Sequence, residues 1–172
     1  LGYDTIISGQ GGGAWQTADG VKQMAEAFQA AAELLMRHGL KMGYHNHWWE
    51  MEPVDGEKLG YELFFEHAPD VAGELDVYWA GNFGKVDVPA LIGRLRSKIQ
   101  FLHIKDGPGV QGEPHTAVGQ GKVDVPSIVQ ADGTEAVAWH IVELDQCATD
   151  MLQAVRDSYH YLTSQGLAEG NK

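Results

Sequence analysis

Cysteine, basic residues and long hydrophobic runs are all scarce in this sequence, and each shortage narrows what the protein can be. Cys147 is the single cysteine among 172 residues. An internal disulfide is therefore excluded, and we expect a reducing, cytoplasmic setting in which Cys147 is a small apolar residue rather than a nucleophile. No stretch reaches the ~18 consecutive apolar residues that a membrane-spanning helix requires. We predict no membrane partner.

Positive charge is also low. The chain carries 12 lysines and arginines against 24 aspartates and glutamates, which gives a net charge of −12. Nucleic-acid binding needs a basic surface that neutralises phosphates, so this balance argues against a nucleic-acid partner. The negative charge itself indicates little more than solubility.

The remaining composition is that of a folded globular domain. Hydrophobic residues make up 44% and charged residues 21% of the chain, which is ordinary for such a domain. The sequence does not begin with methionine, and residues 3–8 already have the pattern of a strand. We expect that an N-terminal portion of the protein is missing from this chain.

Apolar runs and helical periodicities alternate along the chain. Short apolar runs predict strands at residues 3–8, 40–46, 71–77, 99–104 and 137–144. Apolar residues three or four apart predict helices at 17–38, 60–67, 88–95, 125–131 and 149–165. Glycine and proline are frequent in residues 107–126, which predicts a long loop that is either functional or disordered.

This alternation predicts an α/β fold with a parallel sheet and right-handed crossovers. An open doubly wound sheet and part of a (β/α)8 TIM barrel both fit. Polar residues at the C-terminal ends of four strands favour the barrel, because that face carries the active site in such proteins. A complete barrel needs ~250 residues, so residues 1–172 would form a single, incomplete barrel domain of about five βα units.

Residues 40–50 are the most informative stretch. An apolar strand here leads into four groups that bind metals or move protons: His45, Asn46, His47 and Glu50. The next three strands carry further polar groups near their ends: Asp76, His103 and Glu143. Taken alone, an aspartate in this place is typical of a loop cap, and a histidine in an apolar strand is typical of a hydrogen-bonded core residue. Four such strand ends together predict a metal site.

Five short segments carry a family resemblance: Tyr44–Glu50, Leu75–Trp79, Leu102–Asp106, Val118–Gly121 and Val142–Asp145. In this order and spacing they resemble the sugar phosphate isomerase/epimerase family, which consists of xylose-isomerase-like TIM barrels and includes inosose dehydratases and ketose 3-epimerases. The resemblance extends over the whole chain, but it matches only the C-terminal five βα units of such a protein.

The resemblance implies a divalent metal, most often Mn²⁺, with Mg²⁺, Co²⁺, Fe²⁺ or Zn²⁺ as alternatives. The implied ligands are Glu50, Asp76, His103 and Glu143. Many relatives have a glutamate where this sequence has His45, so His45 competes with Glu50 for the place of the fourth ligand.

The implied reaction is sugar isomerisation or epimerisation through a metal-stabilised enediolate, in which a base removes the proton next to a carbonyl. If a hydroxyl lies β to that carbon, the same intermediate expels it. A dehydratase or lyase acting on a keto-inositol or 3-keto-glycoside is therefore the alternative. Glu143 and Glu50 are the first candidates for the acid and base, followed by His45 and His47.

Several other residues are candidates for substrate binding: His47, Asn46, Lys105, Trp79 and Trp48. The tryptophans, with Trp49, suit an apolar wall against a sugar ring, and the lysine suits an oxyanion or phosphate. The lysine would alternatively form a salt bridge with Asp106. His115, in the long loop, is a weaker candidate.

Two other classes of function are considered. Apurinic-site endonucleases share this barrel, but the net charge argues against nucleic-acid processing. A non-catalytic fragment would leave the first and last strands with open edges. Because such edges favour association, we predict a homo-oligomer.

Overall fold

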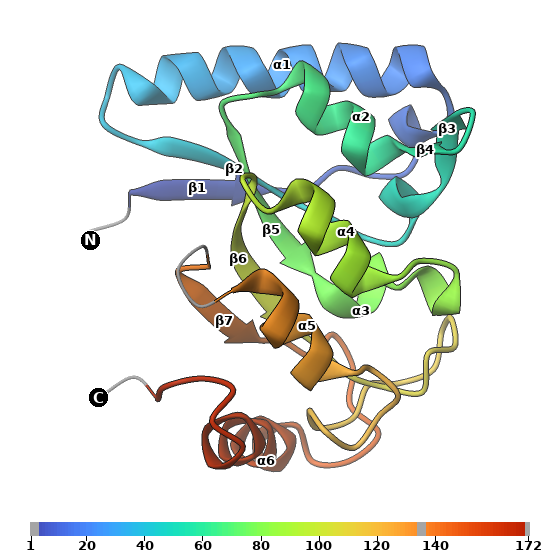
Figure 1. Ribbon diagram of the computed structural model, residues 1–172, viewed down its shortest axis with the longest axis vertical. Helices are drawn as coiled ribbons and strands as arrows, with labels where there is room; N and C mark the ends of the chain where they lie inside the picture. The colour runs from blue at the N-terminus through green and yellow to red at the C-terminus, as the bar shows by residue number, and fades with distance from the viewer. Residues whose placement is uncertain (1–3, 134–136, 171–172) are drawn as a thin grey trace.

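The computed structural model describes residues 4–133 and 137–170 and shows one curled parallel sheet with helices along one side (Figure 1). The strands, in their order across the sheet, are β1 (Thr5–Ser8), β2 (Lys41–His45), β5 (Val71–Asp76), β6 (Ile99–Ile104) and β7 (Trp139–Val142). All four neighbouring pairs are parallel. The α/β fold is confirmed, and the curled sheet fits an incomplete TIM barrel. Residue 3 of the first predicted strand lies outside the described residues.

Each strand is followed by a helix that returns the chain to the other end of the sheet (Figure 1). These helices are α1 (Ala18–Met36), α2 (Gly60–His67), α4 (Val88–Leu95), α5 (Val125–Asp132) and α6 (Met151–Ser164). All five predicted helices are present, with ends shifted by two residues or fewer. Among the described residues, no helix combines the length and the apolar character needed to cross a membrane.

The connections at the C-terminal ends of the strands contain short elements that the sequence pattern does not predict. They are η1 (Ala14–Gln16), η2 (Trp49–Met51), the hairpin β3 (Pro53–Asp55) and β4 (Lys58–Leu59), α3 (Val77–Ala80) and η3 (Asn82–Gly84). Runs of two to four residues are too short to show a periodicity. They matter because they set the directions of the side chains around the site.

An aromatic cluster fills the space between β2 and its covering helices. The ring of Tyr44 lies 4.7 Å from that of Phe64 in α2 and 5.1 Å from that of Phe28 in α1, measured between centroids. Gly73 in β5 leaves room for Ile99 and for Phe65 of α2, because a Cβ there would lie 2.9 Å from Ile99 and 3.2 Å from Phe65. The helices are thus held firmly against the N-terminal strands of the sheet.

The long loop after β6 is ordered by Asp106, whose side chain is fully buried. Its carboxylate accepts four backbone N–H bonds of 2.8–3.0 Å, from Gly107, Gly119, Gly121 and Val123. A Cβ on Gly121 would overlap this carboxylate, so only glycine fits there. The loop is therefore a structured segment, and its anchor leaves Asp106 without the salt bridge to Lys105 that was the alternative expectation.

Candidate metal centre

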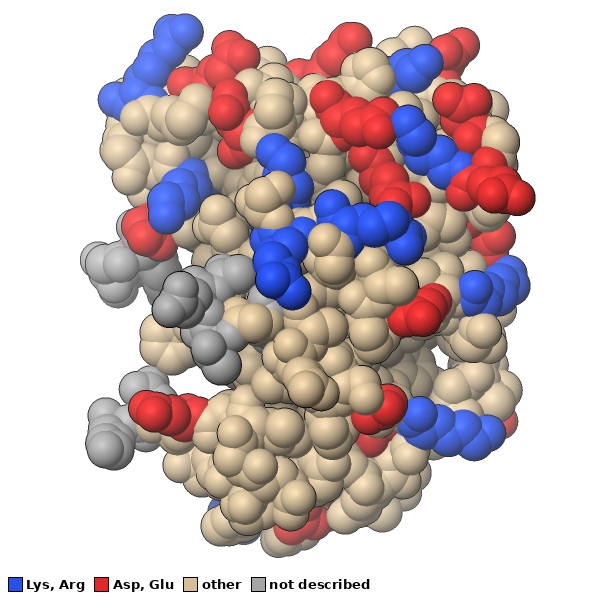
Figure 2. Space-filling view, viewed as in Figure 1, with Lys and Arg blue, Asp and Glu red and all other residues tan. Residues whose placement is uncertain are grey.

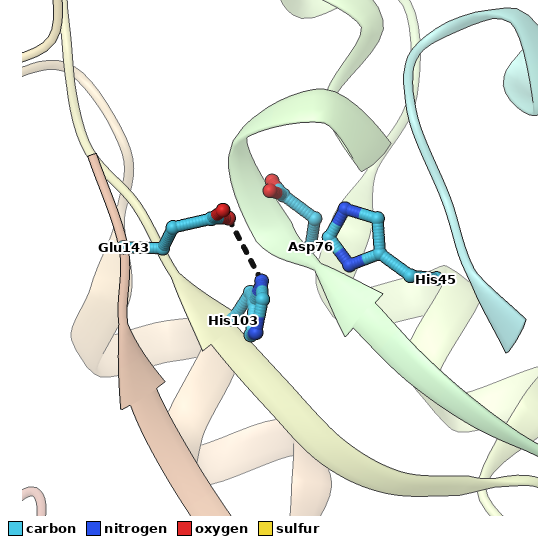
Figure 3. A group of neighbouring side chains, drawn as sticks. All are labelled: His45, Asp76, His103 and Glu143. Carbon is cyan, nitrogen blue, oxygen red and sulfur yellow. Dashed lines mark hydrogen bonds and ion pairs between the residues drawn. The ribbon is translucent and has the colours of Figure 1, made fainter. Parts of the chain in front are cut away.

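Four side chains from four neighbouring strands converge at the C-terminal edge of the sheet (Figure 3). They are His45 at the end of β2, Asp76 at the end of β5, His103 in β6 and Glu143 directly after β7. One donor atom from each lies within 4.8 Å of the others. Three of these residues belong to the predicted ligand set, and the fourth is His45 rather than Glu50.

Strand register explains the convergence. Asp76 of β5 is paired with His103 of β6, and His103 is paired with Ile141 of β7, two residues before Glu143. Paired residues of parallel strands share a face of the sheet, and side chains alternate between faces along each strand. The four groups therefore point to the same, inner side.

The two carboxylate oxygens of Asp76 have different partners. Oδ1 accepts hydrogen bonds from the backbone N–H of Tyr78 and Trp79 and so caps α3. Oδ2 is buried and accepts no well-aligned hydrogen bond from the described residues, although Lys105 Nζ lies 2.9 Å away. Burial raises the pKa of Asp76, and the positive charge of Lys105 opposes this shift. The Oδ2 atom is thus a buried acceptor turned towards the cluster.

His103 lies between two carboxylates. Its Nδ1 is 2.8 Å from Glu143 Oε2, and its Nε2 is 3.2 Å from Glu74 Oε1. Burial alone would lower the pKa of His103, but the bonds to Glu143 and Glu74 raise it to about 9. The bond from His103, against the effect of burial, lowers the pKa of Glu143 to about 2. In the absence of a metal these groups form an ionised network.

Lys105 adds a buried positive charge beside the four groups. Its side chain is 1% exposed, and Nζ lies within 3.0 Å of carboxylate oxygens of Asp76, Glu143 and Asp145. Burial lowers the pKa of Lys105, but these carboxylates outweigh it and raise the pKa above its usual value. Nζ also lies 5.3 Å from the centre of the Trp79 ring. The ammonium group is held charged and fixed in direction.

Glu50 lies outside the cluster. Its side chain is fully buried, with Oε1 accepting from the Tyr44 hydroxyl at 2.9 Å and Oε2 accepting from the backbone N–H of His47 at 2.8 Å. The Tyr44 hydroxyl in turn accepts from the backbone N–H of Gln10 at 3.1 Å. In this structure Glu50, acting through Tyr44, therefore connects the glycine-rich loop after β1 (residues 9–13) to the loop after β2.

The predicted substrate-binding residues are spread around the centre. Asn46 is buried and exchanges two hydrogen bonds with the backbone of Asp76, which joins the ends of β2 and β5. The ring of His47 stacks on that of Trp49 at 4.3 Å between centroids, and a Cβ on Gly12 would lie 3.2 Å from the same indole. Trp49 thus has little free ring face, and Trp48 lies against it edge-on.

A cavity of about 530 Å³ opens above the cluster. Its lining comes from β1, the glycine-rich loop, the histidines and the carboxylates: Ile7, Ser8, Gly9, Gln10, Gly11, His45, His47, Trp49, Glu74, His103 and Glu143. The glycine-rich loop thus borders the cavity at Gly9, Gln10 and Gly11. His115 is buried away from the cavity, against the rings of Tyr78 and Trp79.

Comparison with known proteins identifies the family. The model of the xylose isomerase-like TIM barrel family matches residues 1–132. The chain belongs to this family. The family resemblance inferred from the short sequence segments is therefore confirmed. No curated protein matches the chain.

Solved structures of the same fold include a sugar phosphate isomerase/epimerase from Parabacteroides distasonis, which is 26% identical with a TM-score of 0.80. The alignment covers 98% of this chain but only 60% of that protein. An L-ribulose 3-epimerase shares the fold at 16% identity and a TM-score of 0.60, with 91% of this chain and 60% of that protein covered. A probable 3-DHS dehydratase from Bacillus anthracis also shares it, at 16% identity and a TM-score of 0.69, with 93% of this chain and 63% of that protein covered. The similar structures thus include isomerases, epimerases and a dehydratase.

The donor set of this xylose isomerase-like chain fits a divalent ion. Two imidazoles and two carboxylates suit Mn²⁺, Fe²⁺, Co²⁺ or Zn²⁺. Asp76 Oδ2 is buried and turned towards the cluster, where a divalent ion would add to its ion pair with Lys105 at 2.9 Å. The cluster His45, Asp76, His103 and Glu143 could therefore hold a divalent metal.

Glu74 is the residue at the centre that sequence reasoning missed. It lies in β5 two positions before Asp76, is 7% exposed and contacts both His45 and His103. Strand alternation contains the signal, because residues two apart point to the same face. A buried strand with two acidic residues at this spacing should direct both into the site.

Proposed function

We propose that the protein is a divalent-metal-dependent isomerase or epimerase of a small sugar or keto-sugar. The observation that carries this proposal is the convergence of His45, Asp76, His103 and Glu143 beside a cavity of about 530 Å³. Cavities of this size hold small-molecule ligands. The chain covers only part of the related structures, so the remaining walls of the site would come from elements outside it.

Different groups have different roles in the proposed reaction. A divalent ion, with Mn²⁺ as the first choice, would supply a Lewis acid that polarises a substrate carbonyl. Lys105 is not among the residues that line the cavity, and its role in this proposal is to hold the carboxylates of Asp76, Glu143 and Asp145 in position. Glu143 lines the cavity, and the shortest contacts to His103 and Lys105 are made by its Oε2. We assign to Glu143 the removal of the proton next to the carbonyl. Return of a proton to the neighbouring carbon would give an isomer, and its return to the same carbon from the opposite face would give an epimer.

Other predicted residues take supporting roles in this proposal. His47 lines the cavity and is placed to contact a substrate hydroxyl. Asn46 holds the end of β2 to β5, and Glu50 fixes the backbone of His47. Trp48 and Trp79 both contact the ring of Phe83 and continue the aromatic surface beyond the cavity.

The test is metal binding together with solvent proton exchange. We expect one Mn²⁺ per chain by calorimetric titration, and incorporation of deuterium from heavy water at the carbon next to the carbonyl of a ketose that the protein accepts. His103→Ala should lose both. His38→Ala, which changes an exposed histidine outside the cluster, should retain both. A folded wild-type protein that binds no divalent ion would refute the proposal.

A dehydratase or lyase acting on a keto-inositol or 3-keto-glycoside is the second candidate. The observation that favours it is His45, which lines the cavity at a position where many relatives have a glutamate and could protonate a departing hydroxyl. An unsaturated product that absorbs in the ultraviolet would identify this reaction, whereas an epimerase produces no such absorbance.

We further propose that the protein acts in the cytoplasm as a homo-oligomer. The outer edges of β1 and β7 have no strand partner within the described residues. Unpaired sheet edges favour association. The small-molecule substrate is the partner on which the proposed activity depends.

A further inference from the structure

Glu74 contacts both histidines of the centre with one carboxylate. Oε2 lies 2.9 Å from Nδ1 of His45, and Oε1 lies 3.2 Å from Nε2 of His103. The strands explain this reach, since Glu74 of β5 is the register partner of His45 in β2, and β6 flanks β5 on its other side. The side chain is 7% exposed, so water competes little for these bonds.

The contacts specify which ring nitrogens carry hydrogen. An ionised carboxylate only accepts hydrogen bonds. Oε2 of Glu74 forms a hydrogen bond with Nδ1 of His45 at 2.9 Å, and its Oε1 lies 3.2 Å from Nε2 of His103. Nδ1 of His45 therefore bears the N–H group of this hydrogen bond, and Nε2 of His103 is the nitrogen of that ring that faces Glu74.

The opposite nitrogens face the other two members of the cluster. Nδ1 of His103 is turned towards Glu143, at 2.8 Å from Oε2, and one ring nitrogen of His45 is turned towards the carboxylate of Asp76 (Figure 3). Because Nδ1 of His45 is engaged by Glu74, the remaining nitrogen of that ring is Nε2. Metal-binding histidines commonly donate their second nitrogen to a carboxylate in this way.

We propose that Glu74 is a positioning residue that fixes the orientation and tautomer of both histidines, so that Nε2 of His45 and Nδ1 of His103 are the metal-binding nitrogens. The inference rests on the proposed function, since it presupposes a divalent ion at the cluster. It extends that function by naming the ligand atoms and a second carboxylate on β5 that acts through the histidines. Both oxygens of Glu74 are already engaged by the two rings, which leaves direct ligation to the other four residues.

Glu74→Gln is the most informative variant. An amide has nearly the same shape but only one acceptor oxygen, and its NH₂ group can only donate. One of the two histidines must then present an unprotonated nitrogen to the amide and turn its N–H towards the cluster. We expect one ion per chain to be retained with Mn²⁺ affinity weakened about 10- to 100-fold, the range found when such supporting carboxylates are changed.

Glu62→Gln is the matched control. Glu62 is also a largely buried carboxylate with two donors, at 19% exposure, bonded to Arg94 and to the backbone N–H of Leu59. It lies in α2, and it is not among the residues that line the cavity. The same chemical change there should leave Mn²⁺ affinity within about twofold of the wild type, since no metal ligand contacts it.

Nitrogen NMR of the imidazole rings gives a readout that needs neither activity nor Mn²⁺. In the metal-free wild type, Nδ1 of His45 should carry hydrogen, and in Glu74→Ala this preference should be lost. In protein loaded with diamagnetic Cd²⁺, metal–nitrogen coupling should identify Nε2 of His45 and Nδ1 of His103. Unchanged His45 tautomers in Glu74→Ala, coupling to the opposite nitrogens, or wild-type Mn²⁺ affinity in Glu74→Gln would each overturn the inference.

The failure of this inference is distinguishable from failure of the proposed function. If the wild type binds no ion, the proposed function is lost, and the metal-free NMR comparison still tests whether Glu74 sets the His45 tautomer. If the wild type binds one ion and a crystal structure of the Mn²⁺-loaded protein shows a Glu74 oxygen bound directly to it, the proposed function stands and the positioning role is overturned.

Discussion

The middle of the sheet and its C-terminal edge are packed very differently. All six residues of β5, the central strand, are buried, and α1 and α2 bury aromatic side chains against β2. At the C-terminal edge, β7 has no fully buried residue, and Trp139 is 55% exposed. The helix α6 buries only three of its residues, and Leu152 on its surface is 70% exposed.

The candidate centre spans this difference. Asp76 comes from the most buried strand, whereas Glu143 follows β7, which has no fully buried residue. Glu143 is held by His103 at 2.8 Å and by Lys105 at 3.0 Å. Polar bonds of the site thus secure the end of β7, where the apolar core contributes little. The position of Asp76 is therefore fixed by the apolar core, whereas the position of Glu143 is fixed by polar bonds within the site.

Surface charge follows the same division. Acidic and basic side chains crowd the part of the surface over α1 and α2, whereas the region around α5 and α6 shows few (Figure 2). Exposed apolar residues gather in α6: Met151, Leu152, Val155 and Tyr159. A surface poor in charge and rich in apolar side chains suits contact with another protein surface.

The largest expected effect on stability comes from the aromatic cluster. Phe64 is fully buried, with its ring 4.7 Å from that of Tyr44 and 5.5 Å from that of Phe28. Phe64→Ala should lower the free energy of unfolding by about 3–5 kcal/mol, because it removes buried contacts and leaves a cavity. Urea unfolding followed by circular dichroism measures this. A loss below about 1 kcal/mol would show that the part of the sheet under α1 and α2 is not more tightly packed than the C-terminal edge.

The second-largest expected effect on stability comes from the charge network beneath the cavity. Asp76→Asn removes the carboxylate that faces Lys105, while Glu143 and Asp145 remain as partners. We expect the metal-free protein to lose about 3 kcal/mol, the lower end for breaking a buried pair. Asp145→Asn is the control, since Asp145 is 46% exposed and should cost less than about 1 kcal/mol. Equal losses in the two variants would contradict this order.

The stability of the metal-free protein should also depend on His103. The pKa of His103 is raised from about 6.5 to about 9 in the folded state. Stability from its protonation is therefore complete below about pH 6.5 and is lost as pH rises towards 9. The shift corresponds to about 3 kcal/mol, and partial exposure of Glu143 reduces this to about 2 kcal/mol.

Urea unfolding with a chelator present, repeated across this pH range, measures the dependence. His103→Gln should flatten it, because glutamine does not titrate. A wild-type curve parallel to that of the variant would mean that the network is not ionised as the structure indicates.

Most of the fold was readable from the sequence because it depends on periodicity. The strands and main helices have apolar repeats long enough to recognise, and Thr17 caps α1 as its position suggests. The candidate site could be predicted from the sequence only in part. Ligand candidates at strand ends follow from strand register, whereas the position of Glu50 depends on the short turn η2, which directs its side chain beneath the backbone of His47.

The positions of Lys105 and Glu74 follow from the alternation of side chains along strands, although the sequence alone does not identify their contacts. Lys105 and Asp106 are neighbours in sequence, and strand alternation sends neighbours to opposite sides. Lys105 accordingly joins the centre, while Asp106 anchors the long loop. Glu74 shares a face with Asp76 by the same rule. Its partners His45 and His103 come from strands 29 residues away in sequence on each side, which no local pattern specifies.

The smallest effect should come from the exposed face of α6. Leu152 is 70% exposed, so Leu152→Ala in the monomer should change the free energy of unfolding by no more than about 0.5 kcal/mol. The same change would matter more in the predicted homo-oligomer if this face were covered by a second copy, because the leucine would then be buried. Sedimentation of the wild type, Leu152→Ala and Leu152→Glu at several concentrations separates these cases. Dissociation caused by the glutamate variant, with unchanged unfolding of the separated chains, would place the interface on α6. An oligomer unaffected by both variants would direct attention to the open edges of β1 and β7 instead.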